Sequence, residues 1–460
     1  MLRIQLIKVA CFLHVMAHAT VFSFGQKDVL QEYVEIGLAS NLVVKQRTVA
    51  LENALNVLKQ AKYLYIPTLD FQMLYTTAQG GRQIGLPVGD MLNPVYTTLN
   101  QMMGSNAFPM IENQNINFLP KNYYDARVRL AVPIINMDIV NNKRIVDKQL
   151  AIQENEVEIY QRELVKDIKT SYYNYLSVLK GIEVKQNALD LALTGKRNNE
   201  KLVEAGKGLH AYVLRSETEV AQIESDIIAL QGQLKSLKNY FNLLLNRDQN
   251  EEIVVAQDER IIPFNMINQP SVDKREEIES LNHAIDLRED IVRFNKQTLL
   301  PKLNGFADLG SQAEQMKFND KSVYYMVGLQ LNIPIFNGFK TNLKIKEAKN
   351  NVEIAQLQKE YVENQLSVSL AKSYNDAMTA KQKYEASLKQ LEMAETYHRL
   401  IEKGYAAGVN TYIETVDARA QLSNAKLNVN VQYYQFLSAL ANLEREAATY
   451  ELPNLIKENN

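Results

Sequence analysis

Two long stretches of the chain carry apolar residues at intervals of three and four positions, the spacing of one helix face. The first stretch runs from Val157 to Leu193, with Gln186 as its polar step, and the second from Ile354 to Leu391. No proline lies between Pro133 and Gly206 or between Pro334 and Gly404, so each interval predicts one uninterrupted amphipathic helix of roughly 65 residues, about 100 Å long. A helix of this length must pack against other long helices, as in a coiled coil or a helical barrel.

Each predicted long helix ends at a turn marked by glycine, and a second amphipathic helix follows it. Glycine supplies the left-handed residue that commonly terminates a helix. The following helices are predicted from residue 212 to about 245 and from residue 412 to about 450, giving two antiparallel hairpins with exposed tips. The tip glycines are Gly206, Gly208, Gly404 and Gly408.

On the other side of each predicted long helix, the apolar spacing changes from helical to alternating. Residues 69–72, 127–132 and 330–333 alternate apolar and polar side chains, which is typical of strands. A fourth strand is expected from residue 302, because residues 299–303 repeat residues 65–69 at the start of the first strand. Two strands in each half, about ten residues long with one apolar face, are what a membrane β-barrel uses. Four prolines fall at the ends of the predicted strands, where a missing N–H interferes least with pairing. They are Pro67, Pro133, Pro301 and Pro334.

For any one of these strands alone, a half-buried strand in a soluble sheet is the alternative interpretation. Four strands at matching positions, with tyrosines at their ends, favour the barrel, because such tyrosines resemble its aromatic girdle. Four strands cannot close a barrel, and lipid does not satisfy the backbone groups of an open edge. A chain that spans the membrane must therefore oligomerise, and three chains would supply twelve strands. The tyrosines are Tyr75, Tyr123, Tyr124, Tyr324 and Tyr325.

The chain contains an internal two-fold sequence repeat. The segment Pro-Ile-Ile-Asn at 133–136 recurs as Pro-Ile-Phe-Asn at 334–337. The distance from Pro133 to Gly208 is 75 residues, and from Pro334 to Gly408 it is 74 residues. So close a match over such a long interval indicates that the two halves of the chain share one architecture. The strand-connecting segments differ: the second half needs only 311–321, whereas residues 76–122 form a long, patterned loop, expected outside the cell or folded into the channel mouth.

Residues 1–25 predict an export signal peptide. Arg3 and Lys8 precede an apolar run that is too short and too interrupted to span a bilayer as a helix. Cleavage is expected after Gly25, with residues 17–19 as the second choice, and removal also takes away Cys11, the only cysteine. The predicted organisation of the remaining chain is a first repeat at 26–245, an equatorial linker at 246–272 containing Pro263 and Pro270, and a second repeat at 273–460.

Charge and residue types exclude several function classes. With 53 acidic and 51 basic residues, the net charge of −2 argues against a nucleic-acid binder, which normally carries a basic excess. After signal removal the histidines are His210, His283 and His398, without metal-ligand spacing. There is no glycine-rich phosphate loop and no nucleophile elbow. We therefore expect neither an enzyme nor a cofactor or metal site.

The export signal, the duplicated strand-and-helix unit and the glycine tips together resemble the TolC family of outer-membrane efflux and secretion channels. The resemblance covers nearly all of residues 29–455, and its most specific parts are the Pro-Ile-x-Asn strand ends, the tips and residues 412–418. It implies a mainly α fold with a membrane β-barrel: a homotrimer whose twelve-stranded barrel, four strands per chain, continues into a long periplasmic α-helical barrel. It also implies contact with outer-membrane lipid, and tips that meet a periplasmic adaptor (membrane fusion) protein and an inner-membrane RND or ABC transporter.

The resemblance further places acidic side chains at the closed periplasmic aperture, and the matching positions are Glu414 and Asp417. Residues three apart share one helix face, so a trimer would place six carboxylates around a narrow pore. Such a ring favours cations, and its members raise one another's pKa. From spacing alone, two solvated surface acids are the simpler interpretation, and the matched family position favours the aperture.

The resemblance also gives candidates for closing the tips. Tyr405 matches a tyrosine that helps to hold the closed state in the family. Asn410 and Leu214 replace an arginine and an aspartate of the same latch, and Arg215 lies nearby, where it could pair with Glu414 or Asp417. The tip glycines are the expected contacts for the adaptor.

The predicted function is therefore passive conduction: an outer-membrane exit duct of a tripartite efflux or type I secretion system, opened by adaptor and pump. An exported soluble coiled-coil adaptor or stalk is the alternative, and it explains the helices but not the four strands. Multidrug efflux, metal export and protein secretion use one scaffold, so the fold does not determine the cargo. No methionine or histidine cluster marks a metal path.

Overall fold

The computed structural model describes residues 29–255 and 272–453. The predicted export signal, and the part of the predicted linker that holds Pro263 and Pro270, lie outside the described residues. The chain divides into two compact units. One, here called the helical unit, comprises Met1–Asn53, Ala151–His283 and Ala355–Asn460. The other, here called the strand unit, comprises Ala54–Leu150 and Ala284–Ile354.

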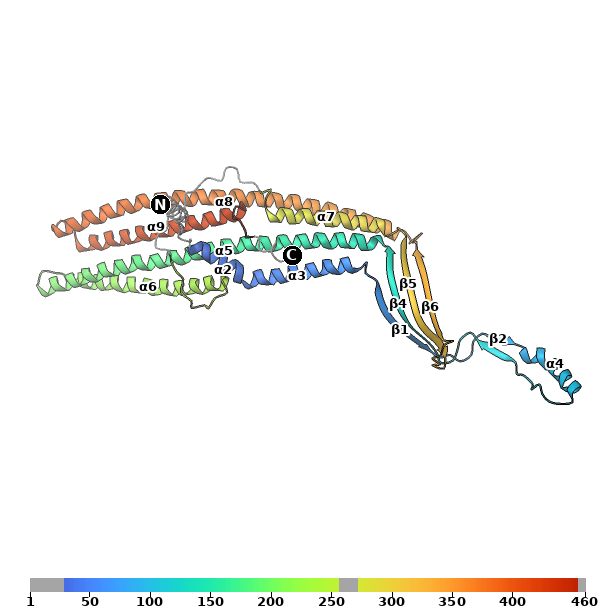
Figure 1. The fold of residues 1–460 in the computed structure, drawn as a ribbon. Coiled ribbons are helices and arrows are strands. Elements are labelled where there is room, and N and C mark those ends of the chain that lie inside the picture. Colours follow the sequence, from blue (N-terminus) through green and yellow to red (C-terminus); the bar gives the residue numbers. More distant parts are fainter. Residues whose placement is uncertain (1–28, 256–271, 454–460) are drawn as a thin grey trace, which may run out of the picture. The chain divides into compact units, whose positions relative to one another are not determined.

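The same order of elements occurs twice along the chain: helix, strand, strand, long helix, helix (Figure 1). A short helix, α2 (Val29–Ser40), precedes the first set. The long helices α5 (Met137–Glu204) and α8 (Lys340–Ala406) have 68 and 67 residues, which confirms the predicted length. The first set is α3 (Leu42–Tyr63), β1 (Thr68–Thr76), β4 (Tyr123–Ile135), α5 (Met137–Glu204) and α6 (His210–Leu244). The second set is α7 (Glu276–Gln297), β5 (Lys302–Glu314), β6 (Val323–Asn332), α8 (Lys340–Ala406) and α9 (Tyr412–Glu446).

The strand unit contains an antiparallel sheet with the order β1-β4-β5-β6. The predicted strands are thereby confirmed, and β1 and β6 are its edges. Pro133 was predicted at a strand end, but it lies inside β4, at a register shift between Pro133 and Ile135. Proline has no N–H to donate, so a strand tolerates it where the ladder is already irregular.

The long segment between β1 and β4 is a folded insertion. Its strands β2 (Gln83–Leu86) and β3 (Gln114–Asn117) pair antiparallel, and α4 (Val88–Met103) lies between them in the chain. Asn93 of α4 donates to the carbonyl of Ile111 at 3.0 Å and accepts from its N–H at 2.8 Å. These side-chain hydrogen bonds hold the segment between α4 and β3, which has no regular secondary structure. The prediction that the insertion lies outside the cell or folds into the channel mouth stays a prediction.

Aromatic residues from α2, α5 and α6 form the main core of the helical unit. The rings of Tyr33 and Phe241 meet edge to face, with centroids 5.0 Å apart, and Tyr172 packs 5.9 Å from both. Gly37 lets α2 approach α5 closely, since an added Cβ would overlap the side chain of Ile168. No helix in the described ranges is both apolar and long enough to cross a membrane.

An ion-pair network near this core connects α5, the start of α7 and the end of α9. Arg275 and Arg445 each donate to the carboxylate of Glu277, both at 2.8 Å, and Arg445 also donates to Glu163 at 3.0 Å. Burial by itself would raise the pKa of Glu277, but the two guanidinium groups outweigh it and lower that pKa from 4.5 to about 2. Glu277 thereby joins the start of α7 to α9, and Arg445 joins α9 to α5 in the first half of the chain.

Candidate functional site

The four-stranded sheet has one continuous apolar face. Cross-strand neighbours share a side of a sheet, and the register aligns apolar residues on all four strands. Phe71, Leu309 and Tyr325 are 70%, 63% and 82% exposed. An exposed apolar surface of this kind marks a contact with lipid or with a partner. Two adjacent rows are Leu69, Leu130, Ala307 and Val327, and Phe71, Val128, Leu309 and Tyr325.

The opposite face of the same sheet is polar. Arg129 of β4 donates two hydrogen bonds, of 2.7 and 2.6 Å, to the buried carboxylate of Asp308 on β5. Arg127 donates to the amide oxygen of Gln72 at 3.3 Å. One apolar and one polar face is the arrangement of a membrane barrel around a water-filled interior.

The tyrosines predicted to form a girdle gather at one end of the sheet, because Tyr75 pairs with Tyr124 in the register. Tyr75 and Tyr325 lie exposed on the apolar face, as a girdle requires. Tyr124 shares that face but is fully buried, with its ring 4.5 Å from that of Phe318. Successive strand residues point to opposite faces, so only part of the tyrosine cluster can meet lipid.

Two of the five tyrosines face the polar side instead. The hydroxyl of Tyr123 donates to Gln312 at 2.7 Å, and that of Tyr324 donates to Asp125 at 2.9 Å. The girdle prediction is wrong for these two residues. Their neighbours in the sequence, Tyr124 and Tyr325, occupy the apolar face, and strand alternation turns each partner of the pair to the other side.

At the second hairpin tip, Glu414 closes the N-terminus of α9 in a capping box. The backbone N–H of Thr411 donates to the Glu414 carboxylate at 2.6 Å, and the Glu414 N–H donates back to the Thr411 hydroxyl at 3.4 Å. Asn410 donates to the same carboxylate at 3.2 Å. The backbone hydrogen bond from Thr411, followed by the Asn410 and Thr411 side chains, lowers the pKa of Glu414. If carboxylates of neighbouring protomers raise the pKa of Glu414, they do so from this lowered value.

Asp417 lies on the exposed side of α9 together with Glu414. Their spacing of three places both carboxylates on one face, as an aperture ring needs. Arg215 of α6 is exposed and lines a cavity next to α9. Within the described part of one chain, Arg215 forms no ion pair with Glu414 or Asp417. Pairing between chains, and the aperture itself, stay predictions.

Three tyrosines from three helices meet just behind the tips. The ring of Tyr412 on α9 lies 5.5 Å from Tyr212 on α6 and 6.1 Å from Tyr405 on α8. Burial, followed by the nearby phenols of Tyr412 and Tyr212, raises the pKa of Tyr405. Tyr405, the predicted closure residue, is thus packed within a cluster that joins the two hairpins.

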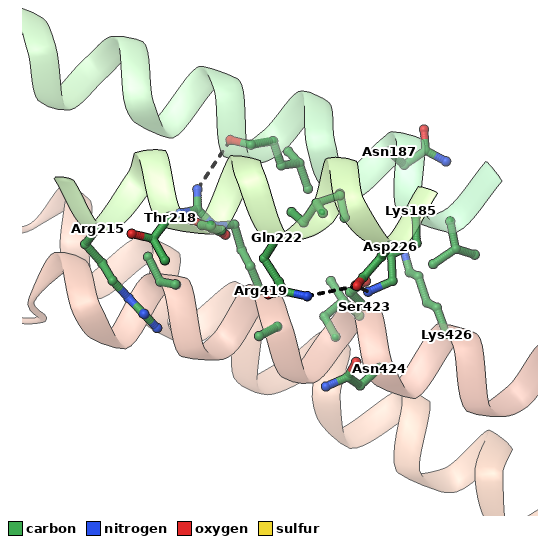
Figure 2. A pocket seen from close by; sticks show the side chains of 18 residues that line it. Lys185, Asn187, Arg215, Thr218, Gln222, Asp226, Arg419, Ser423, Asn424 and Lys426 are labelled. Atoms are coloured by element: carbon green, nitrogen blue, oxygen red, sulfur yellow. Dashed lines mark hydrogen bonds and ion pairs between the residues drawn. The ribbon is translucent and has the colours of Figure 1, made fainter. Parts of the chain in front are cut away.

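Arg419 connects the two hairpins directly. From α9 its guanidinium donates to Glu219 of α6 at 3.2 Å and to the carbonyl of Leu191 in α5 at 3.4 Å. The group also lies over the ring of Tyr412 and donates to its hydroxyl at 3.2 Å. Figure 2 shows this side chain crossing from α9 past α6, with a dashed line to the α5 backbone. We call Arg419, Glu219, Leu191 and Tyr412 the hairpin clamp.

A glycine on α5 makes room for the clamp. A Cβ at Gly195 would lie 2.9 Å from a guanidinium nitrogen of Arg419 and 3.1 Å from the Tyr412 hydroxyl. Burial raises the pKa of Glu219, and the charges of Arg419 and Arg215 offset only part of that effect. Sequence analysis missed Arg419, Glu219 and Gly195. Two features of the sequence could have indicated them. Tyr412 and Arg419 are seven residues apart and therefore share a helix face, and Gly195 is an isolated glycine within a long helix.

The four tip glycines are needed for two different reasons. Gly206 and Gly408 adopt left-handed conformations, with φ of 69° and 73°, and end the long helices as predicted. A Cβ at Gly208 would lie 2.8 Å from the backbone nitrogen of Val203, and one at Gly404 would overlap the side chain of Asn410. Their predicted contact with an adaptor stays a prediction.

Two of the described histidines lie beside glutamates of their own helices. His283 and His398 each lie on one helix, 3.8 and 4.0 Å from a glutamate one turn away. Across residues 29–255 and 272–453, no group of three or more His, Cys, Asp or Glu side chains could hold a metal ion.

Residues 270–448 match a family model described as "Outer membrane efflux protein". The chain is 22% identical over 403 residues to the outer membrane protein TolC of Escherichia coli, covering 81% of this chain and 79% of TolC. It is 21% identical over 349 residues to the alkaline protease secretion protein AprF of Pseudomonas aeruginosa, covering 72% of this chain and 71% of AprF. The match to TolC thus includes both halves of the chain.

Solved structures with a similar fold are also outer-membrane channels. The channel OprN superimposes with a TM-score of 0.73 at 14% identity, covering 91% of this chain and 89% of OprN. The CmeC channel of Campylobacter jejuni gives the same TM-score and identity, covering 91% of this chain and 85% of CmeC. At this identity, the likeness establishes the fold.

Proposed function

Because the chain belongs to the TolC family of outer-membrane efflux proteins, we propose that it is the exit duct of a tripartite efflux or type I secretion system. It resides in the outer membrane and conducts substrates that an inner-membrane pump delivers. The observation that carries the proposal is the sheet with an apolar face, a polar face and two open edges. An exported soluble stalk would leave that apolar face in water.

The open edges support a trimer. The outer sides of β1 and β6 have no strand partner within the described chain. In lipid, each unpaired backbone group costs several kcal/mol, so the edges must pair with other copies. Three chains of four strands supply twelve, with β1 of one chain beside β6 of the next. The apolar rows then face lipid, while Arg129 and Asp308 face the lumen.

The hairpin clamp supports a gating mechanism at the tips. Arg419 and the tyrosine cluster hold α9 against α5 and α6, so the second hairpin cannot move away without breaking these contacts. Glu414 and Asp417 are assigned to the pore aperture, where their negative charge attracts cations. Docking of a periplasmic adaptor and an inner-membrane RND or ABC transporter at the glycine tips releases the clamp. The duct itself is passive.

We propose that the inner-membrane pump, and not the duct, selects the cargo. One relative is named for alkaline protease secretion, and another, CusC of Escherichia coli, for cation efflux. One scaffold thus serves unlike cargoes in proteins similar to this chain, and fold alone does not select among them.

Assembly and membrane insertion test the proposal. The protein is extracted in dodecyl maltoside, its protein mass is measured by light scattering, and it is then mixed with preformed lipid vesicles. We expect the mass of a trimer, a band that changes mobility on heating, and co-flotation with the vesicles. A monomer that stays in solution without detergent would overturn the proposal and favour the soluble stalk.

A further inference from the structure

A cavity of about 430 Å³ lies between α5, α6 and α9 in the helical unit (Figure 2). Its volume falls within the range of cavities that bind small organic molecules. The cavity is distinct from the predicted aperture, because neither Glu414 nor Asp417 lines it. Apolar side chains form much of its wall, and these are Val184, Ala188, Leu191, Ile223, Val416 and Ala420.

The charged residues of the cavity leave an excess of positive charge. Lys185 forms an ion pair with Asp226 at 2.7 Å. The only other carboxylate in the lining, that of Glu219, is paired with the guanidinium of Arg419 in the hairpin clamp, at 3.2 Å. Within each of these pairs the charges balance, so neither pair attracts an anion strongly.

Two further cations line the cavity without such partners. Arg215 and Lys426 are exposed, and neither forms an ion pair within the chain as described. The charge of Arg215 acts on Glu219 from a longer distance, but Arg419 already pairs with that carboxylate. Figure 2 shows Arg215 at one end of the cavity and Lys426 at the other. The Asp226 carboxylate accepts from Lys185 and, at 2.9 Å, from Gln222, and it forms no ion pair with Lys426 in the described chain.

We propose that this cavity binds an amphipathic organic anion. The apolar body of the ligand lies against Ala188, Ile223 and Ala420, and its carboxylate, sulfonate or phosphate group pairs with Arg215 or Lys426. Apolar walls with a few well-placed polar groups are the usual construction of small-molecule sites. A neutral apolar molecule would fill the same space but leave both cations unpaired.

The site would affect the hairpins, since its walls come from both of them. An occupant contacts α5 and α6 on one side and α9 on the other, and so adds a connection beside the hairpin clamp. Ligand binding does not depend on the proposed channel function. A protein that binds the ligand but forms no pore would support the ligand site and contradict the channel function.

Two fluorescent probes that differ by one charged group test the proposal. 8-Anilino-1-naphthalenesulfonate carries a sulfonate, and N-phenyl-1-naphthylamine has the same ring system without it. Each is titrated against the purified full-length protein in dodecyl maltoside, with protein-free micelles of the same concentration subtracted. We expect saturable binding of the sulfonate probe, about tenfold tighter than that of the neutral probe, the ratio that one favourable charge contact supplies.

Matched variants locate the site. Arg215→Gln with Lys426→Gln is expected to weaken sulfonate-probe binding about tenfold and leave the neutral probe unchanged. Lys349→Gln with Lys383→Gln, two exposed lysines of α8 outside the cavity, is the control and is expected to bind like wild type. Ala420→Phe fills the cavity and is expected to weaken both probes. Equal affinity for both probes, no saturable binding, or an unaffected Arg215/Lys426 variant would overturn the proposal.

Discussion

Replacing Arg419 by glutamine is expected to open the tips. Glutamine keeps part of the side-chain length but removes the charge, so the contacts to Glu219 and to the Leu191 carbonyl are lost or weakened. Arg419 and Glu219 side chains are only 14% and 13% exposed, so water screens their interaction less than at the surface. A hydrogen bond to a charged group contributes about 1.5–3 kcal/mol.

Two observations on this pair point in different directions. The 3.2 Å distance describes a formed ion pair. The pKa of Glu219 is nevertheless raised, so burial destabilises its ionised carboxylate more than the charge of Arg419 stabilises it. The lower part of the range, about 2 kcal/mol, is therefore appropriate. If these contacts exist only in the closed state, their loss raises the equilibrium constant for opening roughly 30-fold, at 1.4 kcal/mol per factor of ten.

Single-channel recording in a planar bilayer measures this effect as open probability. Arg399→Gln, at an exposed position of α8, is the matched control and is expected to behave like wild type. Glu219→Gln combined with Arg419→Gln is expected to open the channel no more than Arg419→Gln alone, because both changes remove one interaction. An Arg419→Gln channel that opens as rarely as the Arg399→Gln control would refute the clamp.

Three further predictions concern stability, insertion and selectivity. Glu277→Gln is expected to remove acid-sensitive stability: the carboxylate has a pKa of about 2 in the folded chain against 4.5 ordinarily, so its contribution of up to about 3 kcal/mol is complete above pH 4.5 and is lost as the pH falls toward 2. The melting temperature of the detergent-solubilised protein at pH 7 and pH 3 checks this, and a variant as acid-sensitive as wild type would contradict it. Leu309→Arg on the apolar face is expected to cost about 2–4 kcal/mol in lipid and to reduce the yield of inserted trimer, whereas Gln330→Arg on the polar face is expected to insert normally; equal yields would mean that the apolar face does not meet lipid. Glu414→Gln with Asp417→Asn is expected to weaken cation selectivity, measured as reversal potential in a salt gradient, while glutamine keeps the capping box; an unchanged reversal potential would remove both residues from the aperture.

The helices, the strands and the tips could be predicted because their signals are local. The three-and-four spacing from Val157 gave helices of nearly the observed length, and Gly206 and Gly408 ended them as expected. Alternation also identified the strands, but not their details. Pro133 lies inside β4 because a register shift accommodates it, which depends on the partner strand.

The contacts that hold the tips could not be read from the sequence in the same way. Arg419 and Glu219 are 200 positions apart, and only the packing of α9 on α6 brings them together. The capping role of Glu414 could have been predicted from the sequence, since Thr411 and Glu414 have the spacing of a capping box. The aperture role rests on the family resemblance alone. A residue can serve both roles, because the cap uses one carboxylate oxygen.

Single-channel conductance of the detergent-purified protein, with its trimer mass verified beforehand, tests the central claim most directly. An exit duct closed by an acidic aperture should give small, cation-selective openings that trivalent cations block from the tip side. A protein that inserts no conducting pore, or that runs as a water-soluble monomer, would contradict the assignment of this chain as an outer-membrane channel.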